Sequence, residues 1–213
     1  MKELKKIVWR ALNFLEIGGS VQLYLESALR ENGWFESYHR KRSIDAAGNP
    51  LPWCTYPFIA FLTPRLHSHF EVFEYGSGNS TRWYAAQTKS VQAVEHDEAW
   101  VKEVSQQLPT NAQVTCKELG KTYVQAIELA KKQYHIVVVD GRQRVNCARF
   151  AVDFLTNDGV LILDNSEREN YQEIKTLLKD KGFRWIDFYG MAPIVSHETC
   201  TTIFYRDTNC LGI

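Results

Sequence analysis

Short apolar runs alternate with amphipathic segments over most of this chain. Ile136-Val137-Val138-Val139 and Val160-Leu161-Ile162-Leu163 are continuously apolar, as is typical of parallel strands that helices cover on both faces. The pattern predicts strands at residues 70–75, 90–95, 113–116, 135–140 and 159–164, and helices at 81–87, 98–107, 122–132, 146–156 and 170–181. Such alternation predicts a mostly parallel sheet with right-handed crossovers.

The end of the chain departs from this alternation. Residues 185–189 and 201–205 have the pattern of two strands with no helix between them, so we expect them to pair antiparallel. The predicted fold class is therefore α/β. It is a Rossmann-like, doubly wound, mostly parallel seven-stranded sheet with a C-terminal antiparallel strand pair and an N-terminal helical and loop extension.

The first third of the chain follows a different pattern. Helical periodicity covers residues 2–15 and 20–30, and Gly33 ends the second helix. Residues 34–57 are rich in aromatic residues, arginine, glycine and proline, and the prolines there predict an ordered loop without helix. We therefore divide the chain into a leader, residues 1–66, packed on the core, and a ligand-binding domain, residues 67–213.

Composition narrows the classes of partner. The chain has 213 residues, with 25 basic side chains against 25 acidic ones. Its net charge is therefore zero, which does not favour binding to a phosphate backbone or to an anionic lipid surface. The five cysteines are odd in number and form no CxxC pair, which favours a reducing cytosol over a disulfide framework or a zinc site. We expect a cytoplasmic protein with no membrane partner, since no stretch has the length of a membrane span.

A glycine turn follows the first predicted strand of the sheet. Glycines allow a tight turn and close approach of a ligand, and an acid, Glu74, stands two residues before the first of them. Thr81 occupies the place of the third glycine of the dinucleotide fingerprint, and Glu95 ends the second strand about 20 residues further on. An acid before the turn suits a cationic amino group and repels a pyrophosphate. S-adenosylmethionine has the ammonium group and the ribose that such an arrangement can bind. The alternative is a tight turn between strand and helix that binds no ligand.

The segment Phe73-Glu74-Tyr75-Gly76-Ser77-Gly78-Asn79-Ser80-Thr81, with Val94-Glu95-His96-Asp97 downstream, resembles motifs I and II of the class I S-adenosylmethionine-dependent methyltransferases. The resemblance extends over about residues 70–205. It implies that the motif I acid and glycines hold the methionine end of the cofactor, that Glu95 holds the ribose, and that His96 contacts the adenine. The expected cofactor-binding residues are Glu74, Tyr75, Gly76, Ser77, Gly78, Asn79, Ser80, Glu95 and His96.

Carboxylates also end the fourth and fifth predicted strands. Asp140 ends the fourth strand, and Asp164-Asn165 end the fifth, an oxygen-rich set that suits Mg²⁺. The pattern resembles the metal-dependent catechol-type O-methyltransferases. That resemblance implies that Asp140, Asp164 and Asn165 bind a divalent cation, which lowers the pKa of a substrate hydroxyl. The alternative is that Asp140 is a general base or a cofactor contact, while Asp164 and Asn165 are turn residues. In both cases Asp140 is the candidate catalytic residue.

Three features bear on the molecule that would accept the methyl group. Arg142 can bind a carboxylate or phosphate of the substrate, and Trp53 can stack on it; a solvated charge and a packing residue are their alternatives. Residues 35–42 are basic and aromatic, but at zero net charge we interpret them as a solvated face rather than a nucleic-acid site. The sequence thus predicts a methyltransferase acting on an oxygen of a small molecule or sugar, with an NAD-dependent oxidoreductase and a non-catalytic S-adenosylmethionine-binding module as alternatives.

Overall fold

The computed structural model describes residues 2–213 of the chain. A seven-stranded sheet has the order β3-β2-β1-β4-β5-β7-β6. Strands β1 to β5 are parallel, and β7 lies antiparallel between β5 and β6. The predicted fold class is therefore confirmed. The strands are β1 (Glu71–Tyr75), β2 (Ser90–Glu95), β3 (Ala112–Cys116), β4 (Tyr134–Val139), β5 (Leu155–Asp164), β6 (Arg184–Gly190) and β7 (Thr199–Tyr205).

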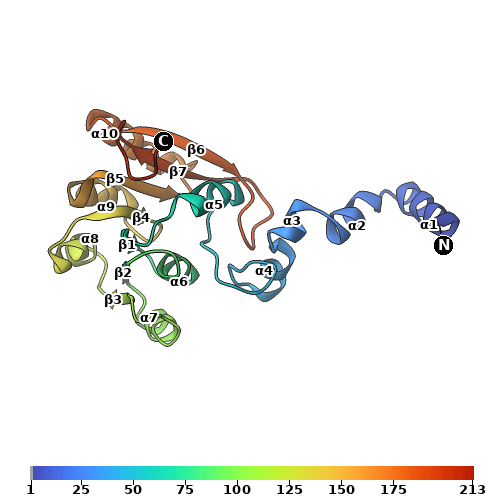
Figure 1. The fold of residues 1–213 in the computed structure, drawn as a ribbon, viewed down its shortest axis with the longest axis horizontal. Helices are drawn as coiled ribbons and strands as arrows, with labels where there is room; N and C mark the ends of the chain where they lie inside the picture. The colour runs from blue at the N-terminus through green and yellow to red at the C-terminus, as the bar shows by residue number, and fades with distance from the viewer. Residues whose placement is uncertain (1) are drawn as a thin grey trace.

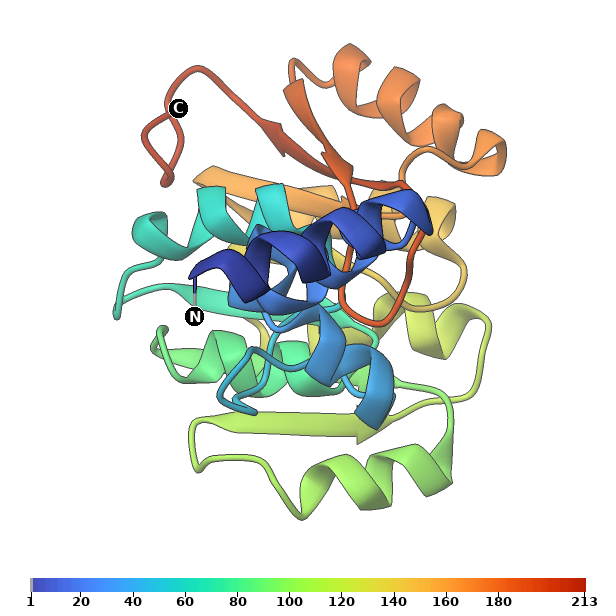
Figure 2. The same cartoon turned by 90° about the vertical axis from the view of Figure 1, so that its right-hand side faces the viewer.

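Helices cover both faces of this sheet (Figures 1 and 2). Along β4, Ile136 packs with helices α5 and α6 on one face, while Val137 packs with α9 and α10 on the other, and both side chains are fully buried. This two-sided burial explains why the strand is continuously apolar. The helices of this body are α5 (Tyr56–Leu62), α6 (Asn79–Ala85), α7 (Glu98–Ser105), α8 (Lys121–Val124), α9 (Arg144–Ala151) and α10 (Gln172–Asp180), with short 3₁₀ helices η1 (Thr63–Arg65), η2 (Gln125–Ala130), η3 (Val152–Phe154) and η4 (Glu169–Tyr171).

The N-terminal helices form an arm that projects from the body (Figure 1) and points toward the viewer in Figure 2. The arm consists of α1 (Lys2–Phe14), α2 (Gly18–Leu25) and α3 (Ala28–Glu31). The helix expected at residues 20–30 is interrupted at Ser27, whose backbone is extended and whose hydroxyl accepts a hydrogen bond from the Arg30 amide. No residue of α1 is buried. Within residues 2–213, no helix has both the length and the hydropathy needed to cross a bilayer.

The region expected to be a loop, residues 34–57, is partly helical. Helix α4 (Trp34–Arg40) opens it, and Tyr56 and Pro57 begin α5. The expectation that proline excludes helix was wrong at Pro57 because a proline in the first helical turn loses no intrahelical hydrogen bond. Similarly, the helix expected to reach residue 156 ends at Ala151, and β5 begins at Leu155. The division of the chain at residue 66 stays a prediction.

Candidate functional site

The glycine turn lies where the ends of β1 and β4 meet. Gly76 has a φ of +102°, and a Cβ there would lie 3.2 Å from the Gly141 amide nitrogen. At Gly141 a Cβ would lie 2.1 Å from the Tyr123 hydroxyl and 2.9 Å from the Gly76 amide nitrogen. The two strand ends therefore approach each other backbone to backbone. In the turn itself, the buried Thr81 hydroxyl accepts a hydrogen bond of 3.1 Å from the Gly78 amide.

Glu74 lies buried beneath this turn. Glu74 is only 2% exposed, and its Oε2 atom has no hydrogen-bond partner within residues 2–213. Burial raises the pKa of Glu74 to about 7, although the Thr81 and Ser80 hydroxyls beside it lower the pKa in part. An unpaired carboxylate oxygen in this position can accept hydrogen bonds from a cationic ligand group.

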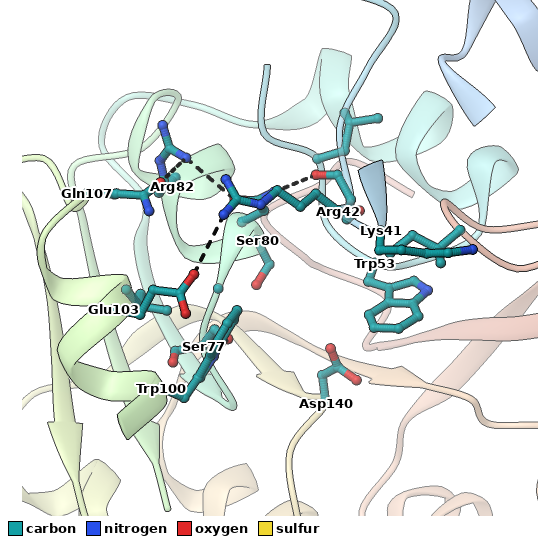
Figure 3. Close-up of a pocket in the computed structure, with 16 residues that line it drawn as sticks. Lys41, Arg42, Trp53, Ser77, Ser80, Arg82, Trp100, Glu103, Gln107 and Asp140 are labelled. Atoms are coloured by element: carbon teal, nitrogen blue, oxygen red, sulfur yellow. Dashed lines mark hydrogen bonds and ion pairs between the residues drawn. The ribbon is translucent and has the colours of Figure 1, made fainter. Parts of the chain in front are cut away.

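A cavity of about 190 Å³ opens above the turn (Figure 3). The leader contributes one wall, helices α6 and α7 contribute others, and Asp140 lies opposite Trp53. Ser43 and Ser77 line this cavity, and their hydroxyl oxygens are buried without partners in the described chain. Buried polar atoms are normally paired, so these hydroxyls fit a polar ligand. The lining residues are Lys41, Arg42, Ser43, Leu51, Trp53, Ser77, Gly78, Asn79, Ser80, Arg82, Trp100, Glu103, Val104, Gln107, Asp140 and Ile194.

Polar contacts hold the leader over this cavity. The Asn79 side-chain amide donates a 2.7 Å hydrogen bond to the Ser43 carbonyl, and Arg42 pairs with Glu103 of α7 at 3.7 Å. Trp100, on the same helix, donates through Nε1 to the Ser77 carbonyl at 2.9 Å. The cavity is therefore formed jointly by the leader and the glycine turn.

Glu95 and His96 line a second cavity, of about 420 Å³, that shares Ser77 and Asp140 with the first. Glu95 Oε1 accepts hydrogen bonds from the His96 amide at 2.6 Å and the Asp97 amide at 3.1 Å, and lies 2.5 Å from His96 Nδ1. These contacts use one carboxylate oxygen and leave Oε2 for the hydroxyl of a ligand. The two cavities flank the glycine turn, and Glu95 lines the second of them.

Tyr75 does not face either cavity. Its side chain is fully buried in the core, and its hydroxyl donates a 2.7 Å hydrogen bond to the Val124 carbonyl. Side chains alternate between the faces of a strand, so only the backbone of Tyr75 borders the turn. The expected contact between Tyr75 and the cofactor would therefore involve its backbone, and it stays a prediction.

The three expected metal ligands have other partners. Asp140 Oδ1 lies 2.9 Å from the Arg144 guanidinium, and Asp164 Oδ1 accepts a 2.7 Å hydrogen bond from Thr201. The Asn165 side-chain amide donates to the Thr199 hydroxyl at 3.1 Å. Among residues 2–213, no group of three or more His, Cys, Asp or Glu side chains is arranged to hold a metal. The donor set does not fit Mg²⁺, and the metal prediction is not supported.

The sequence did not predict the contacts that Arg144 makes in this region. Arg144 begins α9 and is buried. Burial raises the pKa of both Asp140 and Asp164; the Asp140 charge raises that of Asp164 further, and Arg144 lowers both. By contrast, Arg142 is exposed and lines the second cavity. The spacing of Arg144 four residues after Asp140 was its only signal in the sequence.

A strained residue, Ile194, lies in the loop between β6 and β7. Its φ of +74° is costly for a β-branched side chain, and the residue lines the first cavity with Trp53 and Asp140. Trp34 fixes this loop by donating a 2.7 Å hydrogen bond from Nε1 to the Val195 carbonyl. Trp53 is 49% exposed, which leaves its ring accessible to a ligand. Trp53 and Arg142, the two expected substrate residues, line different cavities.

No family model and no curated protein matches this chain. Solved structures do match it. The O-methyltransferase TomG from Streptomyces achromogenes, involved in tomaymycin synthesis and solved with S-adenosylmethionine, is 11% identical, with a TM-score of 0.59 over 88% of this chain and 96% of TomG. The precorrin-6y C5,15-methyltransferase from Geobacter metallireducens is 12% identical, with a TM-score of 0.57 over 70% of this chain and 85% of the other. An rRNA methylase from Streptococcus thermophilus is 14% identical, with a TM-score of 0.56 over 70% of this chain and 96% of the other. The chain thus has the Rossmann-like fold of the class I S-adenosylmethionine-dependent methyltransferases.

Proposed function

We propose that this chain is an S-adenosylmethionine-dependent methyltransferase that acts on an oxygen of a small molecule or sugar. The observation that carries the proposal is the buried Glu74 carboxylate, with an unpaired oxygen, beneath a glycine turn that has a polar cavity on either side. Glu74 would receive the ammonium of the methionine end, with Ser43 and Ser77 beside it. Glu95 would hold the ribose hydroxyls in the second cavity. Asp140, which lines both cavities, would then lie nearest the methyl group.

S-adenosylmethionine supplies the methyl group when it is bound. Asp140 would accept the proton of the acceptor hydroxyl as the oxygen–carbon bond forms and the carbon–sulfur bond breaks, with the electron pair left on sulfur. Burial raises the pKa of Asp140 toward neutrality, which makes it a stronger base than an exposed aspartate. Trp53 faces Asp140 across the cavity and would bound the acceptor (Figure 3).

A binding measurement separates this function from an NAD-dependent oxidoreductase. Thr81 fills the position of the third glycine, and the acid beneath the turn would repel a pyrophosphate. We therefore expect calorimetry to show binding of S-adenosylhomocysteine and none of NAD⁺. The Glu74→Ala variant, which removes the ammonium acceptor, should bind at least about tenfold more weakly. Binding of NAD⁺ alone would reject the proposal.

A transfer assay separates the enzyme from a non-catalytic binding module. Methyl-labelled S-adenosylmethionine would be offered with phenols, sugars, uronic acids and, because one similar structure is an rRNA methylase, RNA. We expect label in an oxygen-bearing small molecule, and loss of transfer with retained S-adenosylhomocysteine binding in Asp140→Asn. RNA is expected to stay unlabelled because the chain has no net positive charge to attract a phosphate backbone. Cofactor binding with no transfer to any acceptor would favour the binding module.

A further inference from the structure

A buried guanidinium lies where the sequence predicted a divalent cation. We propose that Arg144 takes the place of that cation at the ends of β4 and β5, so that the site works without a metal and Arg144 positions Asp140. The catalytic part of this inference rests on the proposed methyltransferase function. The exclusion of a metal rests on geometry alone and can be tested separately.

The hydrogen bonds of Arg144 join the two strand ends. Its Nε donates to the Gly141 carbonyl at 3.0 Å, and one terminal nitrogen donates to the Asp140 carbonyl at 2.6 Å and to Asp140 Oδ1 at 2.9 Å. The other terminal nitrogen donates to the Asp164 carbonyl. The side chain is only 8% exposed. A planar group with several fixed donors can span such a set of acceptors.

The same contacts occupy one oxygen of each aspartate and the backbone carbonyls around them. A hard divalent cation needs several oxygen atoms that converge on one point. Near Asp140, three backbone carbonyls and one carboxylate oxygen already accept hydrogen bonds from Arg144, and Asp164 Oδ1 accepts from Thr201. A divalent ion between the two aspartates would also lie beside the guanidinium and be repelled by it.

Charge explains why a fixed cation is needed here. The side chains of Glu74, Asp140 and Asp164 come from the ends of the adjacent strands β1, β4 and β5, and each has a pKa raised by burial. Buried carboxylates require a compensating charge or a proton. Arg144 is buried and contacts Asp140 and the Asp164 carbonyl, whereas Arg168, which also acts on Asp140, is 53% exposed. Arg144 is therefore the cation that holds this cluster together.

The test measures Mn²⁺ binding, by the loss of the free-ion electron paramagnetic resonance signal, in the presence of S-adenosylhomocysteine. We expect no binding by the wild-type chain or by Arg144→Lys, which keeps a positive charge. Arg144→Ser removes the charge and frees the oxygens, so it should bind Mn²⁺ at least about tenfold more tightly than the wild type. The matched control is Arg149→Ser on the same helix, whose exposed side chain pairs with Glu173; it should behave as the wild type.

Mn²⁺ binding by the wild-type chain that is lost in Asp164→Asn would overturn the proposal. So would an Arg144→Ser variant that binds S-adenosylhomocysteine but takes up no more Mn²⁺ than the wild type. If Arg144→Ser does not fold, the wild type and Arg144→Lys decide the question.

For the catalytic part, EDTA should leave methyl transfer by the wild type unchanged, and loss of transfer with EDTA would contradict this part of the proposal. Failure to bind S-adenosylhomocysteine would reject the proposed function while the Mn²⁺ result still tests the role of Arg144.

Discussion

At the scale of single residues, the site is marked by polar atoms that lack partners. Six buried side-chain atoms in residues 2–213 have no hydrogen bond, and three of them belong to Ser43, Glu74 and Ser77, at or beside the glycine turn. Leaving a buried polar group unpaired costs about 1–3 kcal/mol. Such a concentration is expected where a ligand completes the hydrogen bonding, and it comes from the leader as well as from the turn.

Glu74 should make the stability of the ligand-free chain depend on pH. Its pKa of about 7 lies above the ordinary value of 4.5 for a glutamate side chain, so the folded chain binds this proton more tightly than the unfolded chain does. This stabilisation is complete below about pH 4.5 and is lost as the pH rises through about 7, by up to about 3 kcal/mol. Urea unfolding between pH 5 and 8 should show a decline that is smaller in Glu74→Gln than in the wild type, since the raised pKa values of Asp140 and Asp164 contribute to it in both. Glu118→Gln, an exposed carboxyl, is the control, and an unchanged decline in Glu74→Gln would contradict the assignment.

Gly141 should not tolerate a side chain. A methyl group there would lie 2.1 Å from the Tyr123 hydroxyl and 2.9 Å from the Gly76 amide nitrogen. We expect Gly141→Ala to lower the free energy of unfolding by about 1–3 kcal/mol, as in other overpacked sites, and to weaken S-adenosylhomocysteine binding by displacing the turn. In the control, Gly19→Ala, the methyl group meets nothing within 4 Å and sits in a helix that favours alanine. Equal melting temperatures for the two variants would show that the strand ends can separate.

At the scale of elements, the leader is tied to the sheet through β7. The Thr55 amide, at the start of α5, donates to the Thr201 hydroxyl at 3.1 Å, and that hydroxyl donates to Asp164 Oδ1 at 2.7 Å. Thr55 also donates through its own hydroxyl to the Phe188 carbonyl at 3.0 Å. Asp164, expected as a metal ligand, is thus part of the connection between the leader, β5 and β7.

Replacing Thr201 by valine should break this connection with little change in volume. The Asp164 carboxylate would remain buried without its donor, and the Thr55 amide would lose its acceptor. We expect a loss of about 2–4 kcal/mol in the free energy of unfolding. Thr122→Val is the matched control because that hydroxyl bonds only to the Glu118 carbonyl at an exposed position; its effect should be below about 1 kcal/mol. Chemical denaturation measures both, and a similar small loss in Thr201→Val would mean that the connection contributes little.

The sequence predicted those elements whose signals are local. Continuous apolar runs located β4 and β5, and the position of Glu74 before the glycines located the turn. It did not predict that Arg144 folds back onto Asp140 and Asp164, because that contact depends on the helix beginning one turn after the strand. Nor did it predict that Ser43 closes the first cavity, because nothing near residue 43 indicates a partner 36 residues away, at Asn79.

At the scale of the whole molecule, a compact body carries a projecting helical arm (Figure 1). Several large apolar side chains of this arm are exposed. In α1, Leu4, Ile7 and Val8 are 67%, 63% and 48% exposed. They repeat at helical spacing on one side of the helix, while its lysines lie on the other. Both cavities beside the glycine turn are instead lined by residues 41 and beyond. The arm and the site are therefore built from separate parts of the chain, and the folding of the body should not depend on α1.

Deleting residues 1–17 tests this separation. The deletion removes α1 and no buried side chain, and it leaves α4 and its contacts with the 191–198 loop intact. We expect the melting temperature to change by less than about 3 °C, since a change of about 1 kcal/mol shifts the melting temperature of a domain of this size by about 2–4 °C. We expect the affinity for S-adenosylhomocysteine to change less than about twofold.

Deleting residues 1–44 is the contrasting variant because it also removes Ser43 and the Trp34 hydrogen bond to Val195. The longer deletion should weaken ligand binding at least about tenfold. Equal binding by the two variants would show that the glycine turn holds the ligand without the leader, whereas a large loss in the shorter one would make the arm part of the site.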